Sequence, residues 1–209
     1  MIDFYTWTTP NGRKVSILLE ELGLDYTVHS INIGAGDQKT PEFLKISANS
    51  KIPAIVDNDT GVSLMESGAI LVYLAERHNQ FFPKDSIGRA AVMEWLMWQM
   101  GGLGPMLGQA HHFLHFNSGK SDYAETRFQN EVVRLYGVLE KRLVGRDYIC
   151  DDYSIADMAC WPWVSRYEWQ RVSLAKYPNV RAWYKRLLAR DAVQRGYHVP
   201  KKTNEIPTG

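Results

Sequence analysis

The sequence predicts a two-domain protein in which a small α/β domain precedes an all-helical domain. Short strand-like runs alternate with helical ones in residues 1–77, whereas no convincing strand follows the polar stretch around Pro83. A chain of 209 residues is long enough for two small domains at about 100–200 residues per domain. We expect a first domain at 1–78, a linker at 79–86 and a helical domain at 87–209.

The elements of the first domain follow from hydrophobic spacing and turn residues. Residues 2–7 predict a strand, which ends in a turn at 9–12. Apolar residues within 15–22 recur at the spacing of one helix face, and Gly23 is a typical C-cap. Further strands are predicted at 26–33, 52–56 and 62–64, and a second long helix at 66–77. This order predicts a small mixed sheet with helices packed on it.

The second domain is predicted to contain only helices. Residues 89–100 are apolar with helical spacing, and the Gly/Pro-rich run at 101–105 is expected to interrupt that helix. Residues 123–143 predict a long amphipathic helix, and others are expected from Ser154 onward and at 179–189.

Composition narrows the function. Lys plus Arg number 24 and Asp plus Glu number 23. The chain therefore lacks the excess of basic residues that would indicate a nucleic-acid partner. No apolar run is long enough for a membrane span. The first residues do not show the basic segment and apolar run of a signal peptide, so none is expected. The two cysteines, Cys150 and Cys160, form no CxxC pair. We expect a cytoplasmic protein that binds neither nucleic acid nor membrane.

The turn between the first strand and the first helix is a candidate anion site. Thr9 can cap the helix, and Pro10 suits its first position. A helix N-terminus carries partial positive charge and free N–H groups, which favour an anion such as a thiolate. The alternative is that the turn is only a well-formed cap.

Two other motifs indicate peptide binding. Pro53 in Lys51-Ile52-Pro53 stands where a cis bond is frequent, and a strand edge there could pair with an extended peptide. Glu66 and Ser67 could hold the ammonium and carboxylate of an α-amino acid. The alternatives are a structural proline and ordinary helix capping.

These features, in this order, resemble the glutathione transferase family. The capping residues Ser154 and Asp157 match the family's C-terminal domain. Residues 9–12, the Gly/Met/Trp-rich segment at 98–109 and residues 154–163 narrow the resemblance to the bacterial nu class. The resemblance implies a thioredoxin-like N-terminal domain, an all-α C-terminal domain and glutathione as the bound cosubstrate. It covers nearly the whole chain, which departs from the class in a shorter turn at 57–61 and in its C-terminal tail.

The resemblance implies a role for each motif in holding glutathione as an extended peptide. Glu66 and Ser67 would hold its γ-glutamyl end, and the Ile52 backbone beside Pro53 would pair with its cysteinyl unit. Gln38 and Lys51 would reach the glycyl end, and Arg127 would meet ligand from the helical domain. A solvated helix arginine is the alternative for Arg127.

The glutathione thiol would lie near Thr9 and Asn11. Lowering a thiol pKa by about 1.5 units needs about 2 kcal/mol of preference for the thiolate. A helix end supplies about 0.3–1 kcal/mol, whereas a hydrogen bond to a charged group adds about 1.5–3 kcal/mol. A donor is therefore needed, and we predict the Thr9 hydroxyl and the Asn11 amide, with Tyr5 as the competing hydroxyl.

Other reactive side chains are expected to play no part in the chemistry. His111, His112 and His115 resemble a metal cluster, but no carboxylate or cysteine completes it, so no metal is expected. Cys160 is predicted to be a buried apolar residue, and Cys150 to be partly exposed, with a redox role as its alternative.

We therefore predict a glutathione-dependent disulfide reductase that uses the thiolate of bound glutathione rather than a protein cysteine. The same thiolate could instead attack an electrophilic carbon, as in a glutathione S-transferase, or the site could belong to a non-catalytic glutathione-binding regulatory module. The partners expected are glutathione, a small-molecule disulfide or electrophile, and a second copy of the chain in a homodimer.

Overall fold

The computed structural model describes residues 1–209, which form two compact units. The first unit contains Met1–Phe82 and Arg190–Ile206, and the second contains Pro83–Ala189 and Pro207–Gly209. The expected division placed all of 87–209 in the helical domain. The structure differs because the C-terminal segment Arg190–Ile206 returns to the first unit.

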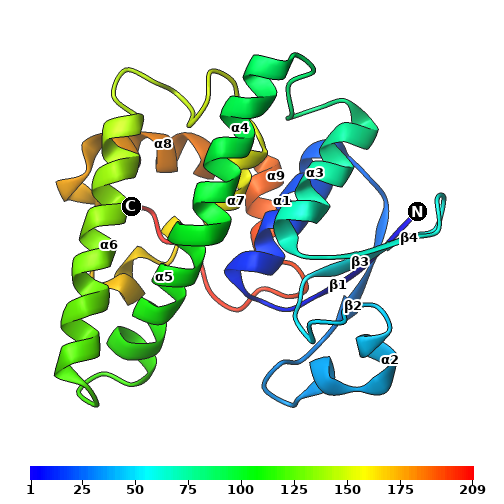
Figure 1. The fold of residues 1–209 in the computed structure, drawn as a ribbon, viewed down its shortest axis with the longest axis horizontal. Helices are drawn as coiled ribbons and strands as arrows, with labels where there is room; N and C mark the ends of the chain where they lie inside the picture. Colours follow the sequence, from blue (N-terminus) through cyan, green and yellow to red (C-terminus); the bar gives the residue numbers. More distant parts are fainter. The chain divides into compact units, whose positions relative to one another are not determined.

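A four-stranded mixed sheet forms the centre of the first unit (Figure 1). Its strands are β1 (Ile2–Thr6), β2 (Tyr26–Ser30), β3 (Ala54–Asp57) and β4 (Val62–Met65). The spatial order is β2-β1-β3-β4, with β1 parallel to β2 and antiparallel to β3. All four strands lie where the hydrophobic spacing predicts them, although β2 is shorter than expected.

Helices cover both faces of this sheet. Helix α1 (Pro10–Leu22) connects the two parallel strands and packs against α3 (Ser67–His78), whereas the short α2 (Pro41–Leu44) contacts the other face through Phe43. Alternation along β1 directs Thr6 toward α1 and Tyr5 toward Phe43. The buried apolar core includes Phe4, Val15, Leu18, Leu19, Ile55, Ile70, Leu71 and Leu74.

The C-terminal helix α9 (Asp191–Tyr197) packs along α1. The Ser16 hydroxyl donates to the Gly196 carbonyl at 2.6 Å, and the Arg13 guanidinium lies 3.5 Å from the centroid of the Tyr197 ring. A Cβ atom on Gly196 would lie 2.7 Å from the Ile17 main chain. This close approach explains why the segment belongs to the first unit.

The contact between α1 and α9 predicts a stability difference between two glycine substitutions. We expect Gly196→Ala to lower the free energy of unfolding by about 2 kcal/mol, because its methyl group would overlap main-chain atoms that cannot move aside. The control Gly137→Ala, within a helix and with no atom near its Cβ position, should stabilise by about 0.5–1 kcal/mol. Thermal and denaturant unfolding measure both; equal stabilities would contradict the packing described.

Five α-helices form most of the second unit. They are α4 (Ser86–Trp98), α5 (Gly104–Ala110), α6 (Asp122–Arg142), α7 (Ile155–Val164) and α8 (Pro178–Leu188). Helix α7 is buried along its whole length, and Ser154 and Asp157 close its N-terminus in the predicted capping box. No helix of the chain combines the length and apolarity that a bilayer crossing requires.

The expected interruption after α4 is wrong. The chain stays helical, because Gln99–Leu103 forms a π-helical turn that leads directly into α5. The Gly104 N–H bonds the Gln99 carbonyl, five residues earlier. The wider turn suits Pro105, which has no N–H to donate and is accommodated in the first turn of α5.

Candidate functional site

The turn before α1 presents a hydroxyl group at a helix N-terminus. Thr9 is the N-cap, and its Oγ1 accepts the Gly12 N–H at 3.2 Å. The Thr9 N–H is itself held by the Trp7 carbonyl at 2.7 Å. Because Thr9 Oγ1 acts as an acceptor within the turn, its own O–H proton remains available as a donor. Asn11, half-buried, lies in the same first turn.

Gly12 allows this turn to lie close to the end of β1. A Cβ atom there would lie 2.3 Å from Thr6 Oγ1 and 2.6 Å from the Trp7 carbonyl oxygen. Only glycine therefore fits without a shift of the main chain. The turn also has no acidic residue, so nothing in it opposes the partial positive charge of the helix end.

The segment before β3 has the geometry of a peptide-binding edge. The Ile52–Pro53 peptide bond is cis. The buried Ser47 hydroxyl donates to the Lys51 carbonyl at 2.8 Å and accepts the Lys51 N–H at 3.3 Å. Strand pairing starts only at Ala54, so the main chain of Ile52 lies outside the ladder. It is placed to pair with an extended ligand.

Gln38 lies beside this segment. The Ser50 hydroxyl donates to the Gln38 carbonyl at 2.7 Å, which joins the loop containing Gln38 to the residue before Lys51. The Gln38 side-chain oxygen is buried and has no hydrogen-bond partner within the chain. A buried acceptor of this kind is stabilised when a ligand donates to it.

Glu66 and Ser67 stand at the start of α3. Glu66 is the N-cap, with φ of 71°, a conformation that L-residues rarely adopt. Its side chain makes no cap hydrogen bond and accepts instead from the Asn49 amide at 3.3 Å. Ser67 is the first helical residue and is 3% exposed. Such local strain is found mostly at binding and catalytic sites.

Lys14 joins the candidate site through a contact that the sequence does not reveal. Its ammonium group donates to the Ser67 hydroxyl at 3.3 Å, and both side chains are buried. It therefore brings a positive charge from α1 to the start of α3, where a ligand carboxylate is expected. A lysine followed by an apolar run is also common on solvated helix faces, so nothing in the local sequence distinguishes it.

Tyr5 is placed away from the Thr9 turn. Its ring stacks on His29 with centroids 4.5 Å apart and lies beside Phe43, on the sheet face opposite α1. Burial raises the pKa of its phenol. This placement favours Thr9 over Tyr5 as the hydroxyl at the helix end.

Arg127 lies on α6 in the second unit. It lines a cavity of about 340 Å³ together with Met106, Phe128 and Arg134. Arg134 forms two 2.7 Å hydrogen bonds with the Glu131 carboxylate, whereas Arg127 makes no ion pair within the chain. Its charge lies near enough to the Glu131 carboxylate to help lower the pKa of that group, and its role toward glutathione stays a prediction.

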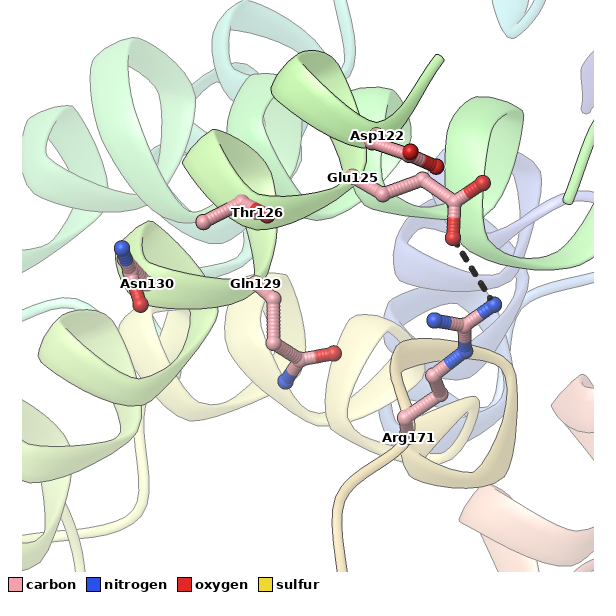
Figure 2. Close-up of a pocket in the computed structure, with 6 residues that line it drawn as sticks. All are labelled: Asp122, Glu125, Thr126, Gln129, Asn130 and Arg171. Atoms are coloured by element: carbon pink, nitrogen blue, oxygen red, sulfur yellow. Dashed lines mark ion pairs between the residues drawn. The ribbon is translucent and has the colours of Figure 1, made fainter. Parts of the chain in front are cut away.

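A second cavity of about 360 Å³ opens at the start of α6 (Figure 2). Arg171 pairs with Glu125 at 3.1 Å, as Figure 2 shows, and also donates to Ser118 Oγ at 2.7 Å. Gln129 donates to the Gln170 carbonyl at 3.3 Å. These bonds join the turn that contains Ser118 to α6 and to the segment after α7. We therefore interpret the cluster as structural.

The histidines at 111, 112 and 115 pack against different aromatic side chains. His111 is buried between aromatic rings, and its Nε2 lies 3.0 Å from the Gln170 amide nitrogen. Burial, with Arg166 nearby, lowers the pKa of His111 to about 3, so the ring is neutral. His115 stacks on Trp169 at 4.3 Å. The chain contains no group of three side chains positioned to hold a metal ion.

Neither cysteine is a reactive thiol. Cys150 is 6% exposed and Cys160 is fully buried, so the expected partial exposure of Cys150 is wrong. Burial, with a smaller effect from Asp157, raises the pKa of the Cys150 thiol to about 11. Because the thiolate is the nucleophile, both cysteines are unreactive near neutral pH.

Comparison with known proteins identifies the family. The profile "Glutathione S-transferase, N-terminal domain" matches residues 2–76, and "Glutathione S-transferase, C-terminal domain" matches 122–186. The chain is 52% identical over 198 residues to the disulfide-bond oxidoreductase YfcG of Escherichia coli, covering 92% of each.

Two further similarities extend this comparison. The chain is 31% identical over 227 residues to Protein URE2 of Eremothecium gossypii, covering 89% of this chain and 64% of that protein. The crystal structure of a Pseudomonas putida glutathione transferase, with one glutathione disulfide bound per subunit, superposes with a TM-score of 0.90 at 44% identity. That match covers 95% of this chain and 91% of the other. The chain, with its thioredoxin-like sheet and helical C-terminal part, belongs to the glutathione S-transferase family.

Proposed function

We propose that the protein is a glutathione-dependent disulfide reductase in which the thiolate of bound glutathione is the nucleophile. The observation that carries this proposal is the Thr9 hydroxyl, which stands at the N-terminus of α1 with its proton free to donate. The disulfide-bond oxidoreductase activity in the name of YfcG supports the choice of reaction. The burial of Cys150 and Cys160 supports a nucleophile supplied by the ligand.

The proposed binding mode places the tripeptide along the first unit. Its γ-glutamyl carboxylate meets Ser67 and the start of α3, with the Lys14 charge behind the Ser67 hydroxyl. Its ammonium meets the Glu66 carboxylate. The cysteinyl unit pairs with the main chain of Ile52 beside Pro53, and the glycyl end approaches Gln38 and Lys51. Arg127 is proposed to contact ligand from the helical part.

The chemistry is two successive thiol–disulfide exchanges. The glutathione thiolate attacks one sulfur of the substrate disulfide, forms a mixed disulfide and releases the other half as a thiolate, which takes a proton. A second glutathione thiolate attacks the mixed disulfide and releases the remaining substrate thiol. Two molecules of glutathione become one of glutathione disulfide, and the substrate gains two electrons and two protons.

Thr9 and Asn11 act on the first thiolate. A glutathione thiol near its free pKa of about 8.5 is only a few per cent ionised at neutral pH. The end of α1 contributes about 0.3–1 kcal/mol toward ionisation, and one donor to the charged sulfur contributes about 1.5–3 kcal/mol. Together they supply the roughly 2 kcal/mol that a pKa reduction of about 1.5 units requires.

We expect Thr9→Ala or Asn11→Ala to reduce disulfide turnover about ten-fold or more, because each removes a donor to the thiolate. Turnover is measured with hydroxyethyl disulfide and reduced glutathione. The control is the double variant Cys150→Ala/Cys160→Ala, which should keep the wild-type rate because both thiols are buried. Loss of turnover in this cysteine-free variant would overturn the proposed mechanism.

Two other functions use the same site. Conjugation of glutathione to an electrophilic carbon is supported by the transferase family itself, and faster turnover of an aryl halide than of hydroxyethyl disulfide would favour it. A non-catalytic regulatory module is supported by the similarity to the nitrogen regulation fragment of the yeast prion protein Ure2p, which is 31% identical to this chain. Glutathione binding without turnover of either substrate would favour the module.

The proposed protein belongs to the nu class, forms a homodimer and acts in the cytoplasm. Ile87 and Met97 on α4 and Val133 on α6 leave large apolar side chains exposed in the second unit, which suits a contact with a second copy. A reaction that consumes reduced glutathione suits the cytoplasm, where glutathione and thioredoxin keep thiols reduced.

A further inference from the structure

A lysine from the C-terminal segment lies beside the turn that would hold the glutathione sulfur. The Lys201 ammonium is 4.6 Å from the centroid of the Trp7 ring, and both residues belong to the first unit. Trp7 directly follows β1, and its carbonyl accepts the Thr9 N–H at 2.7 Å. In Figure 1 the red C-terminal segment passes the blue start of α1.

The charge of Lys201 is not neutralised by the protein. Its side chain is exposed and forms no ion pair within the chain, and its ammonium faces the Trp7 ring. The neighbouring Lys202, in contrast, pairs with Glu205 at 2.5 Å. The first turn of α1 contains no acidic residue and adds the partial positive charge of a helix end. Lys201 and the start of α1 therefore both contribute positive charge near the Thr9 turn.

The Trp7 ring also fixes where this charge stands. An ammonium within about 6 Å of an indole centroid is attracted by the electrons of the ring. A free lysine side chain loses up to about 2 kcal/mol of rotamer entropy when it binds a ligand. Because the ring already restrains Lys201, part of this cost is met before any substrate arrives.

We propose that Lys201 determines substrate specificity by attracting a carboxylate on the incoming disulfide, so that the enzyme prefers anionic disulfides. This inference rests on the proposed function, because it assigns the substrate class of the same site. Lys201 takes no part in the exchange of sulfur bonds. It acts through its charge on the second substrate, whose reacting sulfur must approach the glutathione thiolate at the Thr9 turn.

The test compares three disulfides of similar size and different charge: dithiodipropionate, an anion; hydroxyethyl disulfide, which is neutral; and cystamine, a cation. The measured quantity is the ratio of kcat/KM for the anion to kcat/KM for the neutral compound. We expect Lys201→Met to lower this ratio about five-fold, the size of a favourable exposed charge pair. The corresponding ratio for cystamine should rise.

Two further variants separate charge from structure. Lys201→Arg keeps the positive charge and should keep the wild-type ratio. Lys202→Met removes an adjacent lysine whose charge Glu205 already compensates, and it should also keep the ratio. The preference of the wild-type enzyme for the anion should weaken as salt is added, because exposed charges are screened.

Each contrary result has a distinct meaning. If the wild-type enzyme reduces all three disulfides and Lys201→Met leaves the ratio unchanged, Lys201 does not select substrate and the inference is overturned alone. An equal loss on all three substrates, together with a lower melting temperature, would show a structural role and overturn it as well. A wild-type protein that reduces none of the three would overturn the proposed function and this inference with it.

Discussion

Asp157→Ala is expected to lower the free energy of unfolding by about 4 kcal/mol, because it leaves several buried donors without a partner at about 1–3 kcal/mol each. The carboxylate accepts the Ile149 N–H at 2.9 Å and the Trp183 indole N–H at 2.8 Å through Oδ1. Its Oδ2 accepts the Ser154 N–H at 3.0 Å. All these groups are buried, so water cannot replace the lost acceptor.

Asp157→Asn gives a graded comparison. The asparagine oxygen can keep the bonds to Ile149 and Trp183, but its amide group would face the Ser154 N–H, a second donor. We expect about half the loss of the alanine variant, because one buried donor stays unpaired.

Asp151→Ala is the matched control for both variants. Asp151 pairs with Arg146 at 2.9 Å, but its side chain is 95% exposed, and such surface pairs contribute about 0–1 kcal/mol. Denaturant unfolding followed by circular dichroism measures all three variants. Such a measurement has an error of about 1 kcal/mol. If the free energy of unfolding of Asp157→Ala differs from that of the wild type by no more than this error, the buried network does not hold α7 in place.

Gly12→Ala is expected to reduce kcat/KM for disulfide reduction about a hundred-fold, the effect of moving catalytic groups by about 1 Å. The added methyl group would lie 2.6 Å from the Trp7 carbonyl oxygen, which also holds the Thr9 N–H. Relief of this overlap must move the turn that carries Thr9 and Asn11. The loss should exceed that of Thr9→Ala, because both donors and the helix end shift together.

The measurement combines steady-state kinetics with calorimetric titration of glutathione. Gly137→Ala is the control, since no atom lies near its Cβ position. Circular dichroism establishes whether Gly12→Ala remains folded at the assay temperature. A folded Gly12→Ala variant that keeps wild-type affinity and turnover would show that the turn before α1 is not the place of the reaction.

Local sequence predicts most of the secondary structure because the relevant forces act over a few residues. Gly23 ends α1 in the left-handed conformation with φ of 63°, and Ser154 and Asp157 close the start of α7 in a capping box. Both depend only on residues within one helical turn. The strands follow from alternation, which is equally local.

The errors occur where distant contacts or neighbouring turns decide the structure. Helix α9 is short and acquires its place through packing on α1, more than 170 positions earlier in the chain: the Ser16–Gly196 bond spans 180 residues. The π-helical turn at Gln99–Leu103 replaces the expected break. Hydrophobic spacing predicts neither feature, because it indicates which residues are buried but not which residues they pack against.

The candidate site shows the same division. Thr9, Glu66, Ser67 and the Lys51–Pro53 segment could be selected from sequence, because capping residues and a proline before a strand have local chemical meaning. Lys14 and Lys201 could not, since each acquires its meaning from a contact with Ser67 or Trp7 that the fold creates.

The sequence by itself determined the order of the strands and of the longer helices, the helix caps and the kind of anion site proposed before α1, because these depend on backbone preferences and hydrogen bonds between near neighbours. Only the tertiary structure decided that Arg190–Ile206 belongs to the first unit, that both cysteines are buried, and that two lysines stand beside the proposed glutathione site. The physical reason is that burial and charge placement arise from contacts between residues far apart in the chain, and local patterns carry no information about which residues those are.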